Sequence, residues 1–414
     1  MSIQKICVIG LGYIGLPTAS LLANRGFQVH GVDVVQKTVD IINEGHIHIV
    51  EPDLDTFVQS AVKSGRLIAD IKPTEADVFI IAVPTPFKEH HVPNIDYVIS
   101  ATKSIAPYVK EGNIIILEST SPVGTTDKME ETLQKEGVDI TKLYFAHCPE
   151  RVLPGKIMHE LVHNDRIVGG TTKEATKKTA EFYRTFVKGE VLETDAKTAE
   201  MAKLTENSFR DVNIAFANEL SMLCDKFGID VWELIDLANR HPRVNILQPG
   251  CGVGGHCIAV DPWFIVDAAQ GDAKLIKTAR EVNDYKSQWV IEKVENEVLR
   301  FEKLHGKTPK VACMGLAFKP DIDDLRESPA LYITRSLIAR GVDVLAVEPN
   351  IEEFEEFEIV DFKKGIDEAN IIVFLVAHSE FKGIEIAQNK RVLNFCKLEI
   401  YRTEKSSGQL TKSA

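Results

Sequence analysis

A glycine-rich stretch in the middle of the chain, PGCGVGGHCIAVDP at residues 249–262, carries Cys251 and Cys257, with His256 and Asp261 beside the second cysteine. The nearby histidines do not give the ligand spacing of a closed zinc site, so we expect no metal. A disulfide is disfavoured because seven cysteines, an odd and low number, are typical of a reducing compartment. Two interpretations stay open: structural thiols in a tight turn, or a nucleophilic Cys257 on a flexible loop near Asp261.

A second set of polar residues falls in a long helical pattern over residues 197–228. This stretch has no proline, no internal glycine and apolar residues at three- and four-residue spacing, which predicts one helix ended by Gly228. Lys203, Asn207 and Arg210 share one face of that helix. They form either an exposed polar stripe or a Lys–Asn pair that donates hydrogen bonds to a developing oxyanion. The spacing alone does not decide between the two.

The start of the chain has the pattern of a dinucleotide-binding unit. A short β-rich run at residues 5–10 leads into Gly10-Leu-Gly12-Tyr-Ile-Gly15, a helical pattern follows, and the next predicted strand ends in Asp33. The first glycine permits the turn, the second lets the backbone approach a pyrophosphate, and the third allows close helix–strand packing. An acid at Asp33 binds a ribose 2′-hydroxyl and repels a 2′-phosphate, so we expect NAD rather than NADP.

A weaker copy of this pattern begins at residue 310. The strand KVACMG is followed by Gly315-Leu-Ala-Phe-Lys319, which lacks the glycine triplet, and Glu348 ends the next strand where Asp33 ended the earlier one. We do not expect a second dinucleotide to bind here in the same way. Lys319 and Arg326 either bind phosphates or belong to a solvated charged loop.

Length and composition limit the remaining possibilities. At 414 residues the chain exceeds one ordinary core, and with 44% hydrophobic and 26% charged residues it is typical of a soluble globular protein. It has no apolar run long enough to cross a bilayer, and its start reads as a strand rather than a signal peptide, so we expect a cytoplasmic protein. The net charge of −13 argues against a nucleic-acid binder.

The fold class expected is α/β, with two Rossmann-like doubly wound domains joined by a long central helix. Further strands are predicted at residues 78–83, 114–118 and 143–150, so the first half should be a parallel sheet. The predicted domains are a dinucleotide-binding domain at 1–195, a central helical dimerisation region with the cysteine loop at 196–300, a second Rossmann-like domain at 301–402 and a disordered polar tail at 403–414.

Taken together, the motifs resemble one family, the UDP-glucose/UDP-mannose dehydrogenases. These motifs are VIGLGYIGLP, IHIVEPDL, AVPTPFK, LESTSPVG, CPERVLPG, TAEMAKLTENSFRDVNIAFANEL, NRHPRVNILQPG, GVGGHCIAVDPWFIV and GLAFKPDIDDLRESPA. They run in order from residue 8 to about 330. The resemblance implies an NAD-dependent enzyme that removes four electrons from a sugar nucleotide, and a homodimer built on the long helix. It also implies that the substrate lies between the two α/β halves.

The resemblance assigns roles to single residues by their place in these motifs. It implies that the catalytic residues are Cys257, Lys203, Asn207, Asp261, Glu150 and Thr120. It implies that NAD is bound by Gly10, Gly12, Tyr13, Ile14, Gly15, Asp33, Thr85, Thr126 and Arg326. It implies that the UDP-sugar is bound by Arg151, Val152, Lys203, Asn207, Arg210, His241, Arg243, Gly254 and Lys319.

The implied reaction oxidises the sugar C6 alcohol to an acid in two hydride transfers, with Cys257 holding the intermediate as a thiohemiacetal and then a thioester. By resemblance, HPRVN and PWFIV favour UDP-N-acetylmannosamine as substrate, for surface polysaccharide precursors. UDP-N-acetylglucosamine, UDP-glucose and GDP-mannose would undergo the same chemistry. Two further hypotheses are a two-electron hydroxyacid dehydrogenase, which needs no Cys257, and a protein that binds both nucleotides without turnover. The end of the chain, VLNFCKLEIYRTEK, departs from the family pattern, and Arg402 is not assigned a role.

Overall fold

In the computed structural model, residues 3–88, 91–153, 155–255, 257–403 and 411–413 are described. The chain divides into two compact units. The first is Met1–Glu206 with Trp263–Gln270, and the second is Asn207–Pro262 with Gly271–Ala414.

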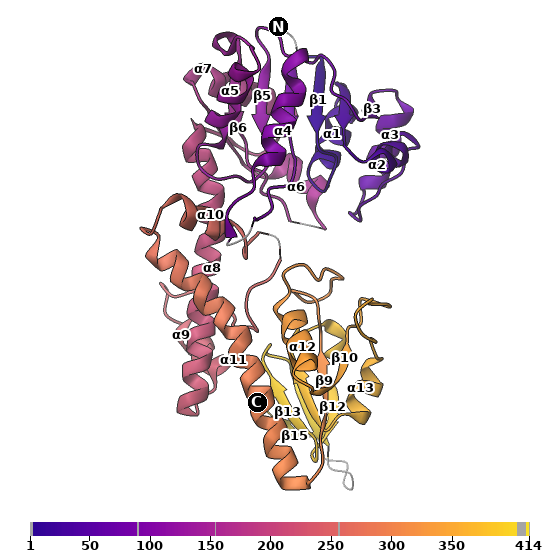
Figure 1. The fold of residues 1–414 in the computed structure, drawn as a ribbon, viewed down its shortest axis with the longest axis vertical. Helices are drawn as coiled ribbons and strands as arrows, with labels where there is room; N and C mark the ends of the chain where they lie inside the picture. The colour runs from indigo at the N-terminus through magenta and orange to yellow at the C-terminus, as the bar shows by residue number, and fades with distance from the viewer. Residues whose placement is uncertain (1–2, 89–90, 154, 256, 404–410, 414) are drawn as a thin grey trace. The chain divides into compact units, whose positions relative to one another are not determined.

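The first unit contains an eight-stranded sheet in the order β3-β2-β1-β4-β5-β6-β7-β8 (Figure 1). Its strands are β1 (Lys5–Ile9), β2 (Gln28–Val32), β3 (Leu67–Asp70), β4 (Val78–Ile81), β5 (Ile114–Leu117), β6 (Tyr144–His147), β7 (Arg166–Gly170) and β8 (Val191–Asp195). Neighbouring strands are parallel except for β6 and β7, which are antiparallel. The predicted all-parallel arrangement is therefore wrong at this pair. The connecting helix has only seven residues, about 10 Å, so β7 starts from the edge where β6 ended.

Helices cover both faces of this sheet. Successive residues of a strand point to opposite faces, so strand β1 contributes side chains to two hydrophobic clusters. Ile6 and Val8 of β1 pack in one hydrophobic cluster, whereas Cys7 and Ile9 pack in a second. The first cluster includes side chains of α1, α3, α6 and α7, and the second includes side chains of α4 and α5. The helices of this unit before residue 196 are α1 (Gly15–Asn24), α2 (Gln36–Asn43), α3 (Leu54–Lys63), α4 (Asp96–Ile105), α5 (Thr125–Lys135), α6 (Ile157–His163) and α7 (Lys173–Tyr183). Short 3-10 helices follow at Ala106–Tyr108 and Ile140–Lys142.

The predicted long helix is present as α8, Ala196–Phe227, with 32 residues. Gly228 follows it with a φ of +69°, the left-handed conformation that glycine adopts at helix ends. The boundary between the two units falls inside this helix, after Glu206. The later helices before residue 306 are α9 (Val231–Ala238), α10 (Asp261–Ala268) and α11 (Lys274–His305).

The second unit contains a four-stranded parallel sheet in the order β10-β9-β11-β13. Its strands are β9 (Lys310–Met314), β10 (Asp343–Val347), β11 (Ile371–Phe374) and β13 (Arg391–Asn394). Val311 and Cys313 pack against α11 and α12 (Pro329–Ala339), whereas Ala312 and Met314 pack against α13 (Phe362–Glu368). This second sheet with helices on both faces is the second Rossmann-like half expected from the sequence.

A three-stranded sheet completes the second unit, with β12 (Ile384–Ala387), β14 (Ile400–Thr403) and β15 (Thr411–Ser413). β14 and β15 are antiparallel. Of the predicted disordered tail at 403–414, residues 404–410 and 414 lie outside the described residues. Within the described part of the chain, no helix has the length and apolar composition that a bilayer crossing requires.

Candidate active site

The Gly10–Gly15 loop lies at the carboxyl end of β1, where β2 adjoins one side of that strand and β4 adjoins the other. Gly10 has a φ of +94°, and a Cβ there would lie 2.6 Å from the Ala82 carbonyl oxygen. A Cβ on Gly15 would lie 1.8 Å from the Gly10 oxygen, whereas one on Gly12 would meet nothing within 4 Å. The outer glycines thus serve the turn and the packing, and Gly12 leaves its backbone open to a ligand.

Asp33 holds this loop in place and keeps part of its surface accessible. Its Oδ2 accepts the Leu11 N–H at 3.1 Å and its Oδ1 accepts the Val35 N–H at 3.0 Å. Tyr13 is exposed and Ile14 is half-buried at the start of α1. An open glycine backbone, a helix N-terminus and a partly exposed carboxylate fit the pyrophosphate and ribose of NAD.

The predicted threonines lie on the loops that follow β4 and β5. The Thr85 hydroxyl donates to the Thr120 carbonyl oxygen at 2.6 Å. Glu200 of α8 accepts from the Thr126 N–H and hydroxyl at 2.8 and 2.7 Å, and from the Gly124 N–H at 2.6 Å. Burial raises the pKa of Glu200, although these three donors stabilise its charge. The sequence motifs gave no signal for Glu200, because it lies 74 residues from Thr126.

Glu150 belongs to a buried network that the sequence motifs did not reveal. Arg166 donates to its Oε2 at 2.6 Å, and its Oε1 accepts the Arg151 N–H at 2.7 Å. Glu118 accepts from the Tyr183 hydroxyl at 2.7 Å. Burial, and secondarily the charge of Glu150, raise the pKa of Glu118 to about 7. The network fixes the carboxylate of Glu150 and the backbone that leads into the next loop.

That loop carries two of the predicted substrate contacts. The Arg151 guanidinium pairs with Glu206 of α8 at 2.8 Å, and Val152 is half-buried. Glu51 accepts the N–H groups of Gly155 and Ile157, both at 2.8 Å. Glu51 lies in the IHIVEPDL motif. The motif therefore contacts this loop through the Glu51 carboxylate.

The polar face of α8 is not a uniformly exposed stripe. Lys203 is half-buried, Asn207 is buried and Arg210 is exposed. Burial lowers the pKa of His147 to about 3, and the positive charge of Lys203 contributes to this shift. Lys203 therefore belongs to the first unit with Thr120 and Glu150, whereas Asn207 belongs to the second.

In the second unit the cysteine loop leads directly into α10. Cys257 is exposed, and its carbonyl oxygen accepts the Val260 and Asp261 N–H groups at 3.1 and 2.8 Å. Asp261, which begins α10, is 3% exposed and accepts from Asn207 Nδ2 at 2.5 Å. The structure thus joins Asn207, Asp261 and Cys257 through two short connections. Cys257 precedes the N-terminus of α10. The dipole of a helix stabilises a negative charge placed before its N-terminus.

Three glycines of this loop pack against protein. A Cβ on Gly252 would lie 2.7 Å from the Ser287 hydroxyl, and one on Gly254 would lie 2.5 Å from the Glu327 oxygen. A Cβ on Gly255 would lie 2.8 Å from the Phe318 ring. Packing against the 315–329 segment therefore accounts for their small size, and close approach to a sugar nucleotide is not needed to explain it.

The other cysteine of the loop has a different environment. Cys251 is buried and forms no disulfide, and its Sγ lies 3.5 Å from the Leu375 oxygen. Burial raises the pKa of its thiol to about 12. A thiol held neutral in this way is a poor nucleophile.

The remaining predicted contacts lie on exposed segments of the second unit. His241 and Arg243 follow α9, and the His241 ring accepts the Arg243 N–H at 3.3 Å. Lys319 is exposed. Arg326 pairs with Asp324 at 2.7 Å, so part of its guanidinium contacts a carboxylate of its own loop.

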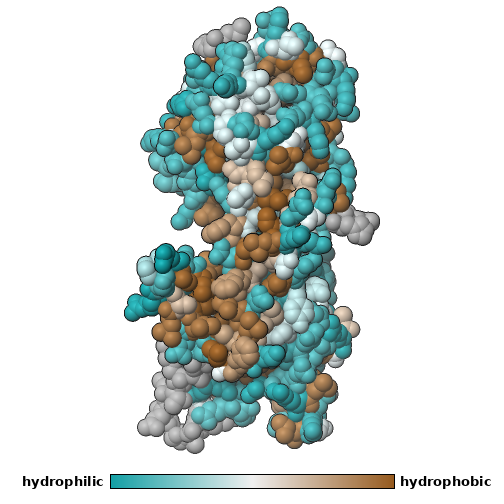
Figure 2. Space-filling model, turned by 90° about the vertical axis from the view of Figure 1, so that its left-hand side faces the viewer, coloured by the Kyte–Doolittle hydropathy of each residue, from teal (hydrophilic) through white to brown (hydrophobic). Residues whose placement is uncertain are grey.

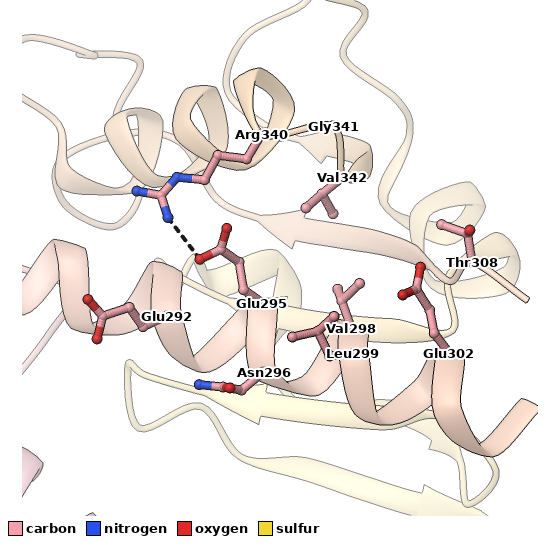
Figure 3. Close-up of a pocket in the computed structure, with 10 residues that line it drawn as sticks. All are labelled: Glu292, Glu295, Asn296, Val298, Leu299, Glu302, Thr308, Arg340, Gly341 and Val342. Atoms are coloured by element: carbon pink, nitrogen blue, oxygen red, sulfur yellow. Dashed lines mark hydrogen bonds and ion pairs between the residues drawn. The ribbon is translucent and has the colours of Figure 1, made fainter.

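A surface pocket of about 510 Å³ lies in the second unit (Figure 3). It is formed by α11 and the end of α12, and Arg340 donates to Glu295 across it at 2.8 Å. None of the predicted site residues lines it.

Comparison with known proteins identifies the class of enzyme. Models of the UDP-glucose/GDP-mannose dehydrogenase family match in succession: its NAD-binding domain over residues 4–187, its central domain over 197–285 and its UDP-binding domain over 312–398. The protein belongs to the UDP-glucose/GDP-mannose dehydrogenase family. The predictions of an oxidoreductase, of NAD as cofactor and of the two-domain α/β fold with a long central helix are confirmed.

Individual relatives cover nearly the whole chain. The UDP-N-acetyl-D-mannosamine dehydrogenase of Campylobacter jejuni is 56% identical over 411 residues, covering 95% of this chain and 99% of the relative. The NDP-N-acetyl-D-galactosaminuronic acid dehydrogenase of Ralstonia nicotianae is 52% identical over 396 residues, covering 92% of each. The solved structure of the UDP-N-acetyl-mannosamine dehydrogenase from Staphylococcus aureus is 42% identical with a TM-score of 0.84, covering 95% of this chain and 98% of that one.

Proposed function

We propose that the protein oxidises the C6 alcohol of UDP-N-acetyl-D-mannosamine to UDP-N-acetyl-D-mannosaminuronate, with two NAD consumed per sugar. The observation that carries this proposal is the 56% identity to a UDP-N-acetyl-D-mannosamine dehydrogenase over 95% of the chain. The product is an acidic sugar nucleotide of the kind used to build surface polysaccharides.

Cys257 is the nucleophile in this proposal. Its exposure supports the role, because Cys7, Cys148, Cys224, Cys251 and Cys313 are all buried. When bound, NAD accepts the hydride that leaves C6, once in each of two oxidation steps. The first step breaks a C6–H bond and releases the hydroxyl proton, which leaves an aldehyde.

The second step needs a nucleophile to add to C6, because a free aldehyde has no alkoxide from which to expel a hydride. The Cys257 thiolate forms an S–C6 bond and gives a thiohemiacetal. Loss of the second hydride converts this adduct to a thioester, and water then breaks the C–S bond. One alcohol and one water thus yield one carboxylate, a restored thiol, two transferred hydrides and three protons.

The surrounding residues hold and polarise this centre. Lys203 stabilises the oxyanion, Asn207 and Asp261 orient the reacting groups, and Glu150 with Thr120 lies near the reacting carbon and the nicotinamide. The hydrogen bond between Asn207 and Asp261 supports this grouping. The NAD contacts proposed are Gly10, Gly12, Tyr13, Ile14, Gly15, Asp33, Thr85, Thr126 and Arg326. The further substrate contacts proposed are Arg151, Val152, Arg210, His241, Arg243, Gly254 and Lys319.

Two serine substitutions test the covalent step. In Cys257→Ser we expect UDP-sugar binding to remain and acid production to fall by at least about a thousandfold, because serine does not form an equally reactive nucleophile. Cys251→Ser is the matched control and should keep acid production within about threefold, since its side chain is buried away from the loop surface. Acid production by Cys257→Ser at the wild-type rate would remove the cysteine from the mechanism.

A second sugar is favoured by the relative that is 52% identical and is named an NDP-N-acetyl-D-galactosaminuronic acid dehydrogenase. The chemistry at C6 is the same for this sugar. Comparing kcat/KM for UDP-N-acetylmannosamine, UDP-N-acetylgalactosamine, UDP-N-acetylglucosamine and UDP-glucose separates the candidates. We expect the first to be preferred, and a preference for another sugar would reassign the substrate without changing the mechanism.

The proposal includes a homodimer built on α8. Phe209, Phe216 and Leu223 are exposed at seven-residue spacing along this helix, and Phe227 is also exposed, an arrangement typical of a buried helix face. Figure 2 shows hydrophobic side chains gathered among hydrophilic ones on the side where α8 and α9 lie. Sedimentation should give a dimer for the wild type and a monomer for Phe216→Asp; a wild-type monomer would overturn this part.

The domain roles and location follow the same proposal. Residues 1–195 bind NAD, 196–300 form the dimerisation region and 301–402 bind the UDP-sugar. The seven cysteines are all free thiols, which supports a reducing compartment such as the cytoplasm.

A further inference from the structure

Three segments of the second unit meet at the carboxyl edge of its parallel sheet. The 315–328 loop follows β9, Glu348 follows β10 and His378 lies just beyond β11. In the sheet order β10-β9-β11-β13, β9 lies between β10 and β11. In open α/β sheets, ligands bind at the carboxyl edge where the connections leave in opposite directions.

His378 connects these segments through both ring nitrogens. The Asp321 N–H donates to Nδ1 at 3.0 Å, and Asn350 Nδ2 lies 3.0 Å from the same atom. Nε2 lies 3.1 Å from Glu348 Oε2. The donors around Nδ1 require the tautomer with its hydrogen on Nε2, which then donates to Glu348. The side chain is completely buried.

Contacts on the other side of Asp321 reinforce this connection. Its Oδ1 accepts the Ser379 N–H at 2.7 Å and the Ser379 hydroxyl at 3.0 Å. Asp321 has a φ of +61°, a conformation that is costly for a residue other than glycine and persists only where neighbouring contacts hold it. The reciprocal bonds between Asp321 and the 378–379 segment are such contacts.

Glu348 holds the beginning of the same loop. Its Oε2 accepts the Leu316 and Ala317 N–H groups at 2.7 and 2.9 Å. The His378–Glu348 pair therefore fixes both ends of residues 316–321, and the exposed Lys319 lies between them.

A cation is the other ligand that these side chains suggest. One potential ligand atom from each of Asp321, His378 and Glu380 lies within 4.8 Å of the others. The Nδ1 lone pair of His378, however, already accepts the Asp321 N–H, and Nε2 faces Glu348. Both ring nitrogens of His378 are therefore engaged in hydrogen bonds that hold the loop, and neither is positioned to ligate a metal.

We propose that His378 is a positioning residue for the UDP part of the substrate. By holding the 316–321 segment in one conformation, it presents the Lys319 ammonium to the diphosphate. This inference rests on the proposed function for its substrate. His378 and the residues it contacts lie within 312–398, the range that matches the UDP-binding domain of the family.

Two substitutions test the roles of the two His378 ring nitrogens separately. In His378→Asn the amide oxygen replaces the Nδ1 acceptor, and in His378→Gln the amide nitrogen replaces the Nε2 donor. We expect the Gln variant to raise the dissociation constant of UDP, measured by calorimetry, and the KM for the UDP-sugar by about tenfold, because the loop must then be ordered on binding. The kcat should stay within about twofold and the NAD KM should not change.

The Asn variant should recover most of the UDP affinity, since it restores the acceptor for Asp321. His305→Gln, the same change at an exposed histidine at the end of α11, is the matched control and should leave the UDP affinity unchanged. Equal UDP affinities in the Gln variant and the wild type would overturn the proposal. Equal losses in the Asn and Gln variants would also overturn it, because they would indicate a general packing role.

Asp321→Gly provides a second test if the Gln variant does not fold. Glycine tolerates the positive φ and keeps the N–H that donates to His378, but it removes the bonds to Ser379. We expect UDP to bind about threefold more weakly, and unchanged binding would overturn the proposal. Because UDP alone is the probe, these outcomes do not depend on turnover. A wild type that binds UDP but oxidises no UDP-sugar would reject the proposed function only.

Discussion

The two Rossmann-like halves use the same turn but treat its backbone donors differently. In the first half Asp33 accepts one N–H of the Gly10–Gly15 loop, and Gly12 stands open. In the second half Glu348, 3% exposed, accepts two consecutive loop N–H groups and also contacts His378.

This difference shows how one fold serves two nucleotides. Loop N–H groups that face open space can donate hydrogen bonds to a pyrophosphate, whereas N–H groups already bonded to a buried carboxylate cannot. Under the proposed function, the second half therefore holds its phosphates with side chains, for which Lys319 is the proposed residue, and the Glu348 carboxylate holds the loop backbone.

The largest effect on stability is expected at the glycine that both halves have in the turn after their first strand. Gly10 and Gly315 have φ values of +94° and +91°, and a Cβ on Gly315 would lie 2.5 Å from Val376 Cβ. Gly10→Ala and Gly315→Ala should each lower the free energy of unfolding by about 2–4 kcal/mol, through backbone strain and overlap. Denaturant titration measures this loss.

Gly112→Ala is the matched control for these two variants. Gly112 has a φ of +88°, but a Cβ there would meet nothing within 4 Å. Only the backbone term, about 1 kcal/mol, should be lost. If Gly10→Ala or Gly315→Ala lowered the free energy of unfolding no more than Gly112→Ala does, steric overlap would not be the reason for glycine in the shared turn.

The next effect concerns the carboxylate of the second half. Burial alone would raise the pKa of Glu348, but hydrogen bonds, first from His378 and then from Leu316 and Asn350, lower it to about 2. A lowered carboxylate pKa contributes stability above its unfolded value, and this contribution is lost as the pH falls through the folded value. Glu348→Gln should therefore cost about 2 kcal/mol near neutral pH.

The pH dependence gives this prediction a second test. The difference between the wild type and Glu348→Gln should shrink as the pH falls from the ordinary glutamate value of 4.5 towards about 2. Denaturant titrations at several pH values in this range measure it. A difference that stays constant with pH would contradict an ionised, hydrogen-bonded Glu348.

The smallest effect concerns the open backbone of the first half. Gly12→Ala should weaken NAD binding about tenfold, or about 1.4 kcal/mol, because its methyl group occupies the space needed by the pyrophosphate. Thermal stability should barely change, since that methyl group meets no protein atom within 4 Å. Ala317→Gly, in the second half, should not alter NAD affinity. Equal NAD affinity in the wild type and Gly12→Ala would place the cofactor elsewhere.

Local patterns were sufficient for several elements but not for their long-range partners. The helix predicted at 197–228 is α8 at Ala196–Phe227, and the strand predicted at 114–118 is β5 at Ile114–Leu117, because periodicity and glycine stops are local signals. The direction of β7 was missed because it depends on how far α6 carries the chain.

The supporting residues of the site were missed for a related reason. Glu51, Arg166 and Glu200 form hydrogen bonds with Ile157, Glu150 and Thr126, respectively. None of these pairs belongs to a repeating sequence pattern. His378 lies 57 residues from Asp321, which it holds. A single sequence carries no signal for such pairs. The packing of the cysteine-loop glycines was also missed, because a sequence does not reveal that Phe318 packs against Gly255.

The central claim is that one exposed thiol couples two oxidations of the same carbon. It is tested most directly by incubating the enzyme with a limited amount of UDP-N-acetylmannosamine and excess NAD. The NADH formed is then counted against the sugar consumed. We predict two NADH for each sugar, with the uronate as the only sugar product. One NADH for each sugar, with the aldehyde released, would contradict the claim.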